Sequence, residues 1–308
     1  MCKLAICIPT LGNRPVVEEI LLYSIDYLTK YGVDIYYYDS GKNSAVKTIT
    51  EEFAEKGYGN IYHVPLDSKI SYGEKIDLIF SGYALARDYE YIWPIKDRVI
   101  CNEDMLRLVL RRCEAGADIV ISLSLGDIFE EDHIDNVSPI EIYGLFAKQT
   151  TSLETVIYNR KTVLDNYAFG DSKTAPKYQN DFWHYRFLYN TLAQTPNPII
   201  SVISKDGAYN MRSSVPQESG WIDRALEVWI DEWVRINYEL PDIYSPFKAK
   251  AIKDTTSIDE LLGNKEMFVT LHERGVLNEK TYEKYKDMWE FVTTVPKEDI
   301  RSIALGSV

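Results

Sequence analysis

The chain has 308 residues, which is enough for one large domain or two with a substantial core. Its 34 Lys and Arg residues against 47 Asp and Glu residues give a formal net charge of −13, the wrong sign for a general binder of nucleic acid or anionic membranes. A hydrophobic content of 45% and a charged content of 26% are typical of a globular protein and exclude a disordered chain.

Short apolar runs alternate with segments of helical periodicity from residue 4 to residue 125. The runs that predict strands are 4–8, 34–38, 61–64, 89–95 and 118–125, and the segments that predict helices are 16–31, 46–56, 72–88 and 103–115. Apolar strands that alternate with helices indicate a mostly parallel sheet with helices on both faces. The sequence therefore predicts an α/β protein with a Rossmann-like sheet.

The pattern changes after Pro196, where tryptophans recur at helical spacing among acidic residues. Helical periodicity occupies segments 219–238, 264–274 and 278–292. We expect a sheet domain at residues 1–215 and a helical carboxyl-terminal region at residues 216–308. The sequence leaves open whether that region forms an acceptor site or a homo-oligomer interface.

The compartment is predicted from the cysteines and from the absence of long apolar runs. None of Cys2, Cys7, Cys101 and Cys113 has the spacing of a CxxC motif, which favours reduced thiols. The apolar start of the chain ends at Pro9, too early for a signal-peptide core, and no run approaches the roughly 20 residues of a membrane span. We expect a cytoplasmic protein with no transmembrane segment.

Polar residues follow three of the predicted strands. They are Pro9-Thr10, Asp39-Ser40-Gly41 and Lys96-Asp97-Arg98. In parallel sheets ligands bind beyond the carboxyl ends of the strands, so these residues are candidates for a site. The loop from Pro9 to Pro15 lacks the GxGxxG of a dinucleotide site, and the chain has no P-loop, HExxH, GxSxG or zinc-spaced Cys and His set.

In order and spacing these segments resemble family 2 glycosyltransferases. Residues 4–10 are similar to the opening strand with its Pro-Thr turn, 35–41 to the strand that ends in Asp-x-Gly, and 72–75 to a Gly-led helix start. Residues 91–106 resemble the strand that carries the metal-binding DxD and the helix after it. Segments 151–160 and 180–186 resemble the strand near the acceptor site and the acidic pair that supplies the catalytic base. The resemblance covers about residues 1–200 and implies the GT-A fold.

The resemblance also implies roles for single residues. Pro9 and Thr10 would contact the base or ribose, Asp39 would bind the nucleoside, and Asp181 would be the general base. Each has a structural alternative, since Asp39 suits an Asp-Ser-Gly turn and Asp181 suits a helix cap. Lys75 could reach a phosphate, but a solvated lysine is the favoured interpretation.

The chain departs from the family where the DxD is expected. Lys96 and Arg98 stand in the places of the two aspartates, with Asp97 between them. Cations cannot ligate Mg²⁺ or Mn²⁺, which take oxygen ligands, whereas Lys and Arg can neutralise a diphosphate directly. The sequence leaves three interpretations open: substitution of the metal by Lys96 and Arg98, a metal retained through Asp97, or no such role, with the triplet either a charged surface loop in solvent or part of an inactive site.

The resemblance implies an enzyme of the hexosyltransferase type that acts in glycan biosynthesis. It would move a sugar, with inversion, from a nucleotide-sugar donor, most of all a UDP-linked one, to a glycan, lipid-linked or protein-attached acceptor. Two alternatives remain: a sugar-phosphate nucleotidyltransferase, and a non-catalytic glycosyltransferase-like subunit that assembles with an active partner. The donor sugar, the linkage and the acceptor have no readable code in the sequence.

Overall fold

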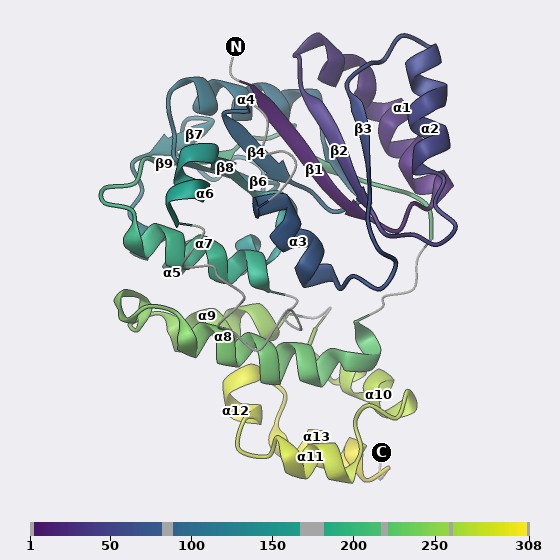
Figure 1. Ribbon diagram of the computed structural model, residues 1–308. Coiled ribbons are helices and arrows are strands. Elements are labelled where there is room, and N and C mark those ends of the chain that lie inside the picture. The colour runs from purple at the N-terminus through teal and green to yellow at the C-terminus, as the bar shows by residue number, and fades with distance from the viewer. Residues whose placement is uncertain (1–2, 82–88, 167–181, 217–220, 259–260, 307–308) are drawn as a thin grey trace. The chain divides into compact units, whose positions relative to one another are not determined.

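The computed structural model of the protein describes residues 3–81, 89–166, 182–216, 221–258 and 261–306 (Figure 1). The chain forms two compact units. The first contains residues 1–139 and 149–216, and the second contains residues 140–148 and 217–308. The first unit carries every strand that the structure describes, while the described elements of the second unit are all helical.

The first unit is built on an eight-stranded sheet with the order β3-β2-β1-β4-β8-β6-β9-β7. Its strands are β1 Leu4–Thr10, β2 Asp34–Asp39, β3 Ile61–Pro65, β4 Tyr91–Pro94, β6 Ile119–Leu123, β7 His133–Asp135, β8 Val156–Asn159 and β9 Ile200–Ser204. β8 runs antiparallel to both β4 and β6, and β7 runs antiparallel to β9, whereas the other neighbouring pairs are parallel. The expected mostly parallel sheet is confirmed.

A two-stranded ribbon accompanies the sheet. β5 Val99–Cys101 pairs antiparallel with β10 Asn210–Arg212, and the residue partners run from Arg212 opposite Val99 to Asn210 opposite Cys101. β5 was not predicted from the sequence, because its three residues are too short a run to show alternation. The ribbon brings residues 210–212 next to the segment that follows β4.

Helices cover both faces of the sheet (Figure 1). Those of the first unit are α1 Arg14–Lys30, α2 Val46–Glu55, α3 Tyr72–Ser81, α4 Glu103–Glu114, α6 Arg160–Asn166 and α7 Trp183–Gln194, with the short 3₁₀ turns η1 Gln149–Thr151 and η2 Leu153–Thr155. The side chains of Asn13 and Asn102 cap α1 and α4 by accepting hydrogen bonds from Val16 N and Met105 N. α1 and α4 therefore begin close to the carboxyl ends of β1 and β5.

Alternate residues of the central strands enter separate cores on the two faces. Ile6 and Tyr37 lie in the core that also takes apolar residues of α1, α2 and α4. On the other face α3 and α7 meet in an aromatic cluster, in which Phe80 lies 5.0 Å from Tyr158 and 4.7 Å from Phe187 between ring centroids. The strands are thus buried on both sides, as their continuous apolar runs indicate.

The second unit is a set of short helices. They are α5 Pro139–Phe146, η4 Ile222–Arg224, the π-helical η5 Glu227–Glu232, α8 Trp233–Glu239, η6 Asp242–Tyr244, α9 Lys248–Thr256, α10 Lys265–Glu273, α11 Glu279–Lys284, α12 Trp289–Val292 and α13 Lys297–Ala304. The helix expected at 219–238 is continuous over residues 222–239, with the π-helical η5 in its middle, whereas the single helix expected at 278–292 is wrong, because residues 285–288 form a turn. That turn lets buried Trp289 pack between Phe268 and Tyr282, at centroid distances of 5.9 and 6.1 Å.

Two adjacent leucines of α1 test which face of this helix packs on the sheet. Leu21 is fully buried and Leu22 is 70% exposed. We expect Leu21→Ala to lower the free energy of unfolding by about 3 kcal/mol, because it leaves a cavity, and Leu22→Ala to change it by less than about 0.5 kcal/mol. Urea unfolding of the two variants measures both values. Equal losses would contradict the packing of α1 on the sheet.

Candidate active site at the carboxyl edge of the sheet

Three of the predicted strand ends meet at one edge of the sheet. Thr10 ends β1 and is paired in register with Asp39, which ends β2. The Oγ1 atom of Thr10 donates a hydrogen bond to Oδ2 of Asp97, 3.1 Å away in the turn after β4, and accepts one from Gly12 N. Thr10, Asp39 and Asp97, chosen from the sequence as separate strand ends, therefore belong to one constellation. Pro9 lies buried within β1 and contributes to the strand end through its backbone.

Lys75 occupies the space beneath these strand ends. Its side chain comes from the first turn of α3, is 5% exposed, and donates from Nζ to the carbonyl oxygen of Thr10 at 2.9 Å. Burial lowers the pKa of this amine, and the nearby carboxylates of Asp97 and Asp39 oppose that effect. The expectation of a solvated lysine is wrong, because the periodicity of α3 turns Lys75 toward the sheet.

Both carboxylate oxygens of Asp39 have partners. Oδ1 accepts a hydrogen bond from Gly41 N, and Oδ2 lies 2.9 Å from Nε2 of His63 on β3. Asp39 is 5% exposed, so its orientation is fixed by these two contacts. His63 was not assigned to the site from the sequence. The parallel pairing of the predicted strands β2 and β3 could have identified it, because this pairing places His63 opposite Tyr37, two residues before Asp39.

Glycines let the loops after β1 and β2 pack directly on each other. A Cβ at Gly41 would lie 2.0 Å from the carbonyl oxygen of Leu11, and one at Gly12 would lie 1.9 Å from Oγ of Ser44. Gly12 also has a φ of +70°, which favours glycine. The two loops therefore touch backbone to backbone at Gly41, and at Gly12 only the small Ser44 side chain lies between them.

Asp97 is a partly buried carboxyl group with hydrogen-bond donors and cations around it. Burial raises its pKa, and the hydrogen bond from Thr10, the charges of Arg98 and Lys75 and a hydrogen bond from the Leu11 backbone act in the opposite direction. Removing such a group from water is costly unless a ligand or another charge compensates. Its position at a strand end and its burial therefore mark it as a candidate functional residue.

The flanking cations Lys96 and Arg98 have partners on different segments. Lys96 Nζ lies 3.6 Å from Oε2 of Glu154, which is 4% exposed in η2. Arg98 donates from Nη2 to the carbonyl oxygen of Val215. Lys96 therefore extends toward the η2 side of the site, and Arg98 toward the segment that follows β10.

The charges around Asp97 do not suit a divalent metal ion. A metal held by Asp97 would face Lys75 and Arg98, whose charges repel it, and would compete with the hydrogen bond from Thr10. Within the described ranges, no three His, Cys, Asp or Glu side chains gather as a ligand set. The described donors thus fit an anion near Lys75, Lys96 and Arg98 better than a cation.

The predicted base, Asp181, lies outside the described residues. The helix expected after it is present as α7, whose first turn contains His184. His184 is 3% exposed and its Nε2 lies 2.9 Å from the carbonyl oxygen of Thr151, so it donates there. Burial lowers the pKa of this imidazole to about 4. His184 is therefore neutral at physiological pH and positions η1 rather than transferring protons.

Because His184 is buried in its neutral form, we expect the free energy of unfolding to fall in acid. Between about pH 6.5 and about pH 4 the unfolded chain binds a proton at this residue and the folded chain does not, so stability falls as the pH falls. We expect this loss to reach up to about 3 kcal/mol. Urea unfolding across this range measures it. His184→Gln should remove this part of the pH dependence, while His133→Gln should retain it, and an unchanged slope in His184→Gln would refute the assignment.

No described helix combines the length and the apolarity that crossing a bilayer requires. No protein-family model matches the chain, and no curated protein is similar to it in sequence. Among solved structures, S. aureus TarS 1–349 in complex with UDP-GlcNAc is similar over 98% of this chain and 90% of that chain, at 14% identity and a TM-score of 0.56. The mannosyltransferase PcManGT from Pyrobaculum calidifontis, in complex with GDP-Man and Mn²⁺, is similar over 98% and 86%, at 10% identity and a TM-score of 0.51. This chain therefore has the GT-A glycosyltransferase fold.

Proposed function

We propose that the chain is a family 2 type, hexose-transferring enzyme that moves a sugar, with inversion, from a UDP-linked donor to a glycan, lipid-linked or protein-attached acceptor. The observation that carries the proposal is the meeting of Thr10, Asp39 and Asp97 around buried Lys75 at the carboxyl edge of the sheet. Ligands of open α/β sheets bind at this edge. The similar TarS structures, two of them with UDP or UDP-GlcNAc, support the choice of nucleotide.

The nucleoside half of the donor would lie against β1 and β2. Asp39, held by Gly41 N and His63, accepts hydrogen bonds from the ribose or base, and the backbone at Pro9 and Thr10 forms the adjoining wall. Because Asp39 is already oriented, little conformational entropy is lost when it binds the nucleoside.

The diphosphate would be neutralised by fixed cations. Lys75 uses one of its three donors on Thr10, which leaves two for phosphate oxygens. Lys96 and Arg98 flank the same turn, and a guanidinium can bind two phosphate oxygens at once. The charge of Asp97 opposes the lowering of the pKa of Lys75 by burial, and the hydrogen bond to Thr10 holds the side chain in place. We propose that these cations replace the divalent metal that the DxD of related enzymes would bind.

The chemical step would be a single displacement at the anomeric carbon. The carboxylate of Asp181 takes the proton of the acceptor hydroxyl, whose oxygen bonds to the anomeric carbon as the bond to the β-phosphate oxygen breaks. The electron pair of that bond leaves with UDP, and the fixed cations stabilise the charge that develops there.

A titration with UDP, with and without EDTA, tests the cation substitution. We expect the same Kd in both, because no described ligand set requires a metal. Lys96→Met and Arg98→Met should each weaken UDP binding about tenfold through a lost charge-assisted hydrogen bond, and leave uridine binding unchanged.

Lys47→Met is the control for these variants, since Lys47 is an exposed residue of α2. A loss of UDP affinity in EDTA would overturn the substitution and favour a metal at Asp97. Failure of UDP, GDP, dTDP and CDP sugars to bind or be turned over would overturn the proposed function, and pyrophosphate release from a nucleoside triphosphate would favour nucleotidyl transfer instead.

The role of Asp181 is tested by Asp181→Asn. We expect turnover of the donor sugar to be abolished, because the amide cannot accept the proton, while the Kd for UDP stays unchanged. Release of UDP from UDP-GlcNAc and UDP-glucose measures turnover. Asp165→Asn, which alters an exposed carboxylate on α6, is the control. Normal turnover in Asp181→Asn would remove this residue from the mechanism.

A further inference from the structure

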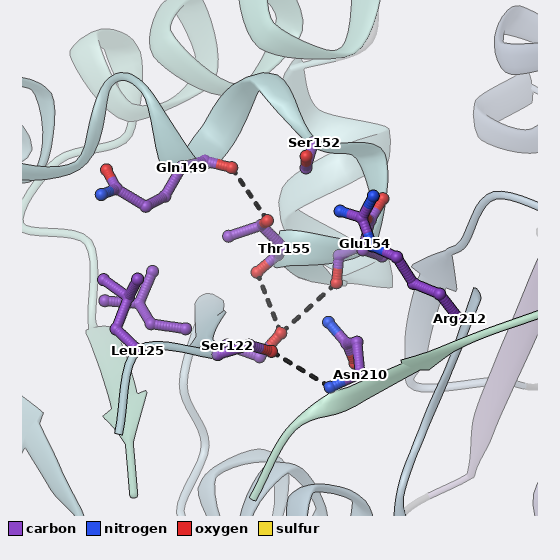
Figure 2. Close-up of a pocket in the computed structure, with 10 residues that line it drawn as sticks. Ser122, Leu125, Gln149, Ser152, Glu154, Thr155, Asn210 and Arg212 are labelled. Atoms are coloured by element: carbon purple, nitrogen blue, oxygen red, sulfur yellow. Dashed lines mark hydrogen bonds between the residues drawn. The ribbon is translucent and has the colours of Figure 1, made fainter. Parts of the chain in front are cut away.

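β10 lies between a cavity and the turn that carries Arg98. The side chains of Asn210 and Arg212 line this cavity, which has a volume of about 210 Å³ and opens at the carboxyl end of β6 (Figure 2). Its lining also includes residues from 122–125 and 149–155. The backbone of β10 pairs with β5, and Ser213 extends this pairing, because its N–H donates to the carbonyl oxygen of Arg98 at 2.8 Å. Segment 213–215, which follows β10, therefore lies beside the turn of the proposed diphosphate site.

Arg98 contacts segment 213–215 with its side chain as well as with its backbone. The side chain of Arg98 is half-buried, and its Nη2 donates to the carbonyl oxygen of Val215. A guanidinium group has five N–H donors, so this contact leaves others for phosphate oxygens. The position of Val215 therefore determines where the guanidinium group of Arg98 lies.

Segment 213–215 is held in turn by the carboxylate of Glu19 on α1. Ser214 N lies 3.0 Å from both oxygens of this carboxylate, and Ser214 Oγ donates to Oε1 at 2.6 Å. Ser213 Oγ donates to Oε2 and accepts a hydrogen bond from Val215 N at 3.3 Å. The hydrogen bonds from Ser213 and Ser214 lower the pKa of Glu19 to about 2, so its carboxylate is an anion at physiological pH. Glu19 therefore fixes both residues that precede Val215.

The neighbouring residue Glu18 shows how different the environment of Glu19 is. Oε1 of Glu18 lies 2.7 Å from Nη2 of Arg14, one turn away on the same helix, and such surface ion pairs contribute little to stability. Glu19 instead accepts hydrogen bonds from one backbone N–H and two hydroxyl groups of a segment that is distant in sequence. Hydrogen bonds to a charged acceptor are stronger than those between neutral groups. The carboxylate of Glu19 therefore serves to hold segment 213–215 on α1.

We propose that Glu19 is a positioning residue, which holds segment 213–215 so that Val215 orients the guanidinium group of Arg98 toward the diphosphate. The inference rests on the proposed function, in which Arg98 binds phosphate oxygens. A long side chain that becomes ordered only when a ligand binds loses conformational entropy at that moment, and this loss weakens the binding. Because Val215 already orders Arg98, the loss is avoided when the diphosphate binds.

Glu19→Gln tests the proposal, because it keeps the size of the side chain and removes its charge and one acceptor oxygen. Calorimetry measures the Kd for UDP and for uridine, and thermal unfolding checks that each variant is folded. We expect Glu19→Gln to weaken UDP binding about fivefold and to leave uridine binding unchanged, since uridine has no phosphate.

Two further variants accompany this measurement. Ser213→Ala removes a donor on the other side of the same contact, and it should weaken UDP binding in the same way as Glu19→Gln. Glu18→Gln is the matched control, since it makes the same substitution at the adjacent position of α1, and it should leave both affinities unchanged.

A double variant with Arg98→Met distinguishes positioning from a general effect on the fold. If Glu19 acts through Arg98, Glu19→Gln has no further effect once Arg98 is replaced, and the double variant should bind UDP as Arg98→Met does, about tenfold more weakly than the unaltered protein. Independent effects would multiply to a loss of about fiftyfold, and that result would overturn the proposal.

The remaining outcomes separate the role of Glu19 from the proposed function. Unchanged UDP binding in Glu19→Gln and Ser213→Ala, or an equal loss for UDP and uridine, overturns the role of Glu19 and leaves the proposed function standing. Unchanged UDP binding in Arg98→Met overturns the cation substitution and the role of Glu19 together. If the unaltered protein does not bind UDP, the proposed function itself fails, and the inference fails with it.

Discussion

The hydrogen bond from Lys75 Nζ to the carbonyl oxygen of Thr10 is the contact on which the arrangement of the site depends. It anchors an ammonium group beneath the ends of β1 and β2, where burial alone would favour loss of the proton. The carboxylates of Asp97 and Asp39 oppose that effect on the pKa of Lys75, and the charge of Lys75 in turn opposes the effect of burial on the pKa of Asp97. Lys75 and Asp97 therefore stabilise each other's charge.

Because the charge of Lys75 already compensates that of Asp97, the turn after β4 can carry the cations Lys96 and Arg98. In a site built on two aspartates, a divalent ion brings the positive charge and the protein brings the negative charge. Here Lys75 is already part of the chain, so Lys96 and Arg98 can extend to η2 and to the segment after β10 without leaving Asp97 unpaired. The positive charge is then fixed by packing and hydrogen bonds rather than by coordination, which is the property that the proposed metal-independent diphosphate site would require.

How far the sequence predicts this structure depends on the direction of each strand. From residue 4 to residue 125 each strand is an apolar run, buried on both faces except in the edge strand β3, and parallel pairing follows from the helices between the runs, so the meeting of Thr10, Asp39 and Asp97 could be expected. Lys75 was misjudged because lysine side chains are rarely buried, although it stands four residues before Ile79 on the buried face of α3. In the second unit, helical periodicity continued through the turn at residues 285–288, because aromatic residues are buried on both sides of it.

Strand direction also explains why Glu154 was not selected as a site residue. Site residues were sought after parallel strands, because a polar residue there lies at the carboxyl edge of the sheet. β8 is antiparallel to β4 and β6, so its amino end lies at that same edge. Glu154, in the η2 turn directly before β8, therefore lies there as well. The antiparallel β8 between β4 and β6 therefore places the acidic side chain of Glu154 at an edge where the neighbouring strands have their carboxyl ends. Its carboxylate meets Lys96 there, and this ion pair links the charges around Thr10 to the cavity at β6.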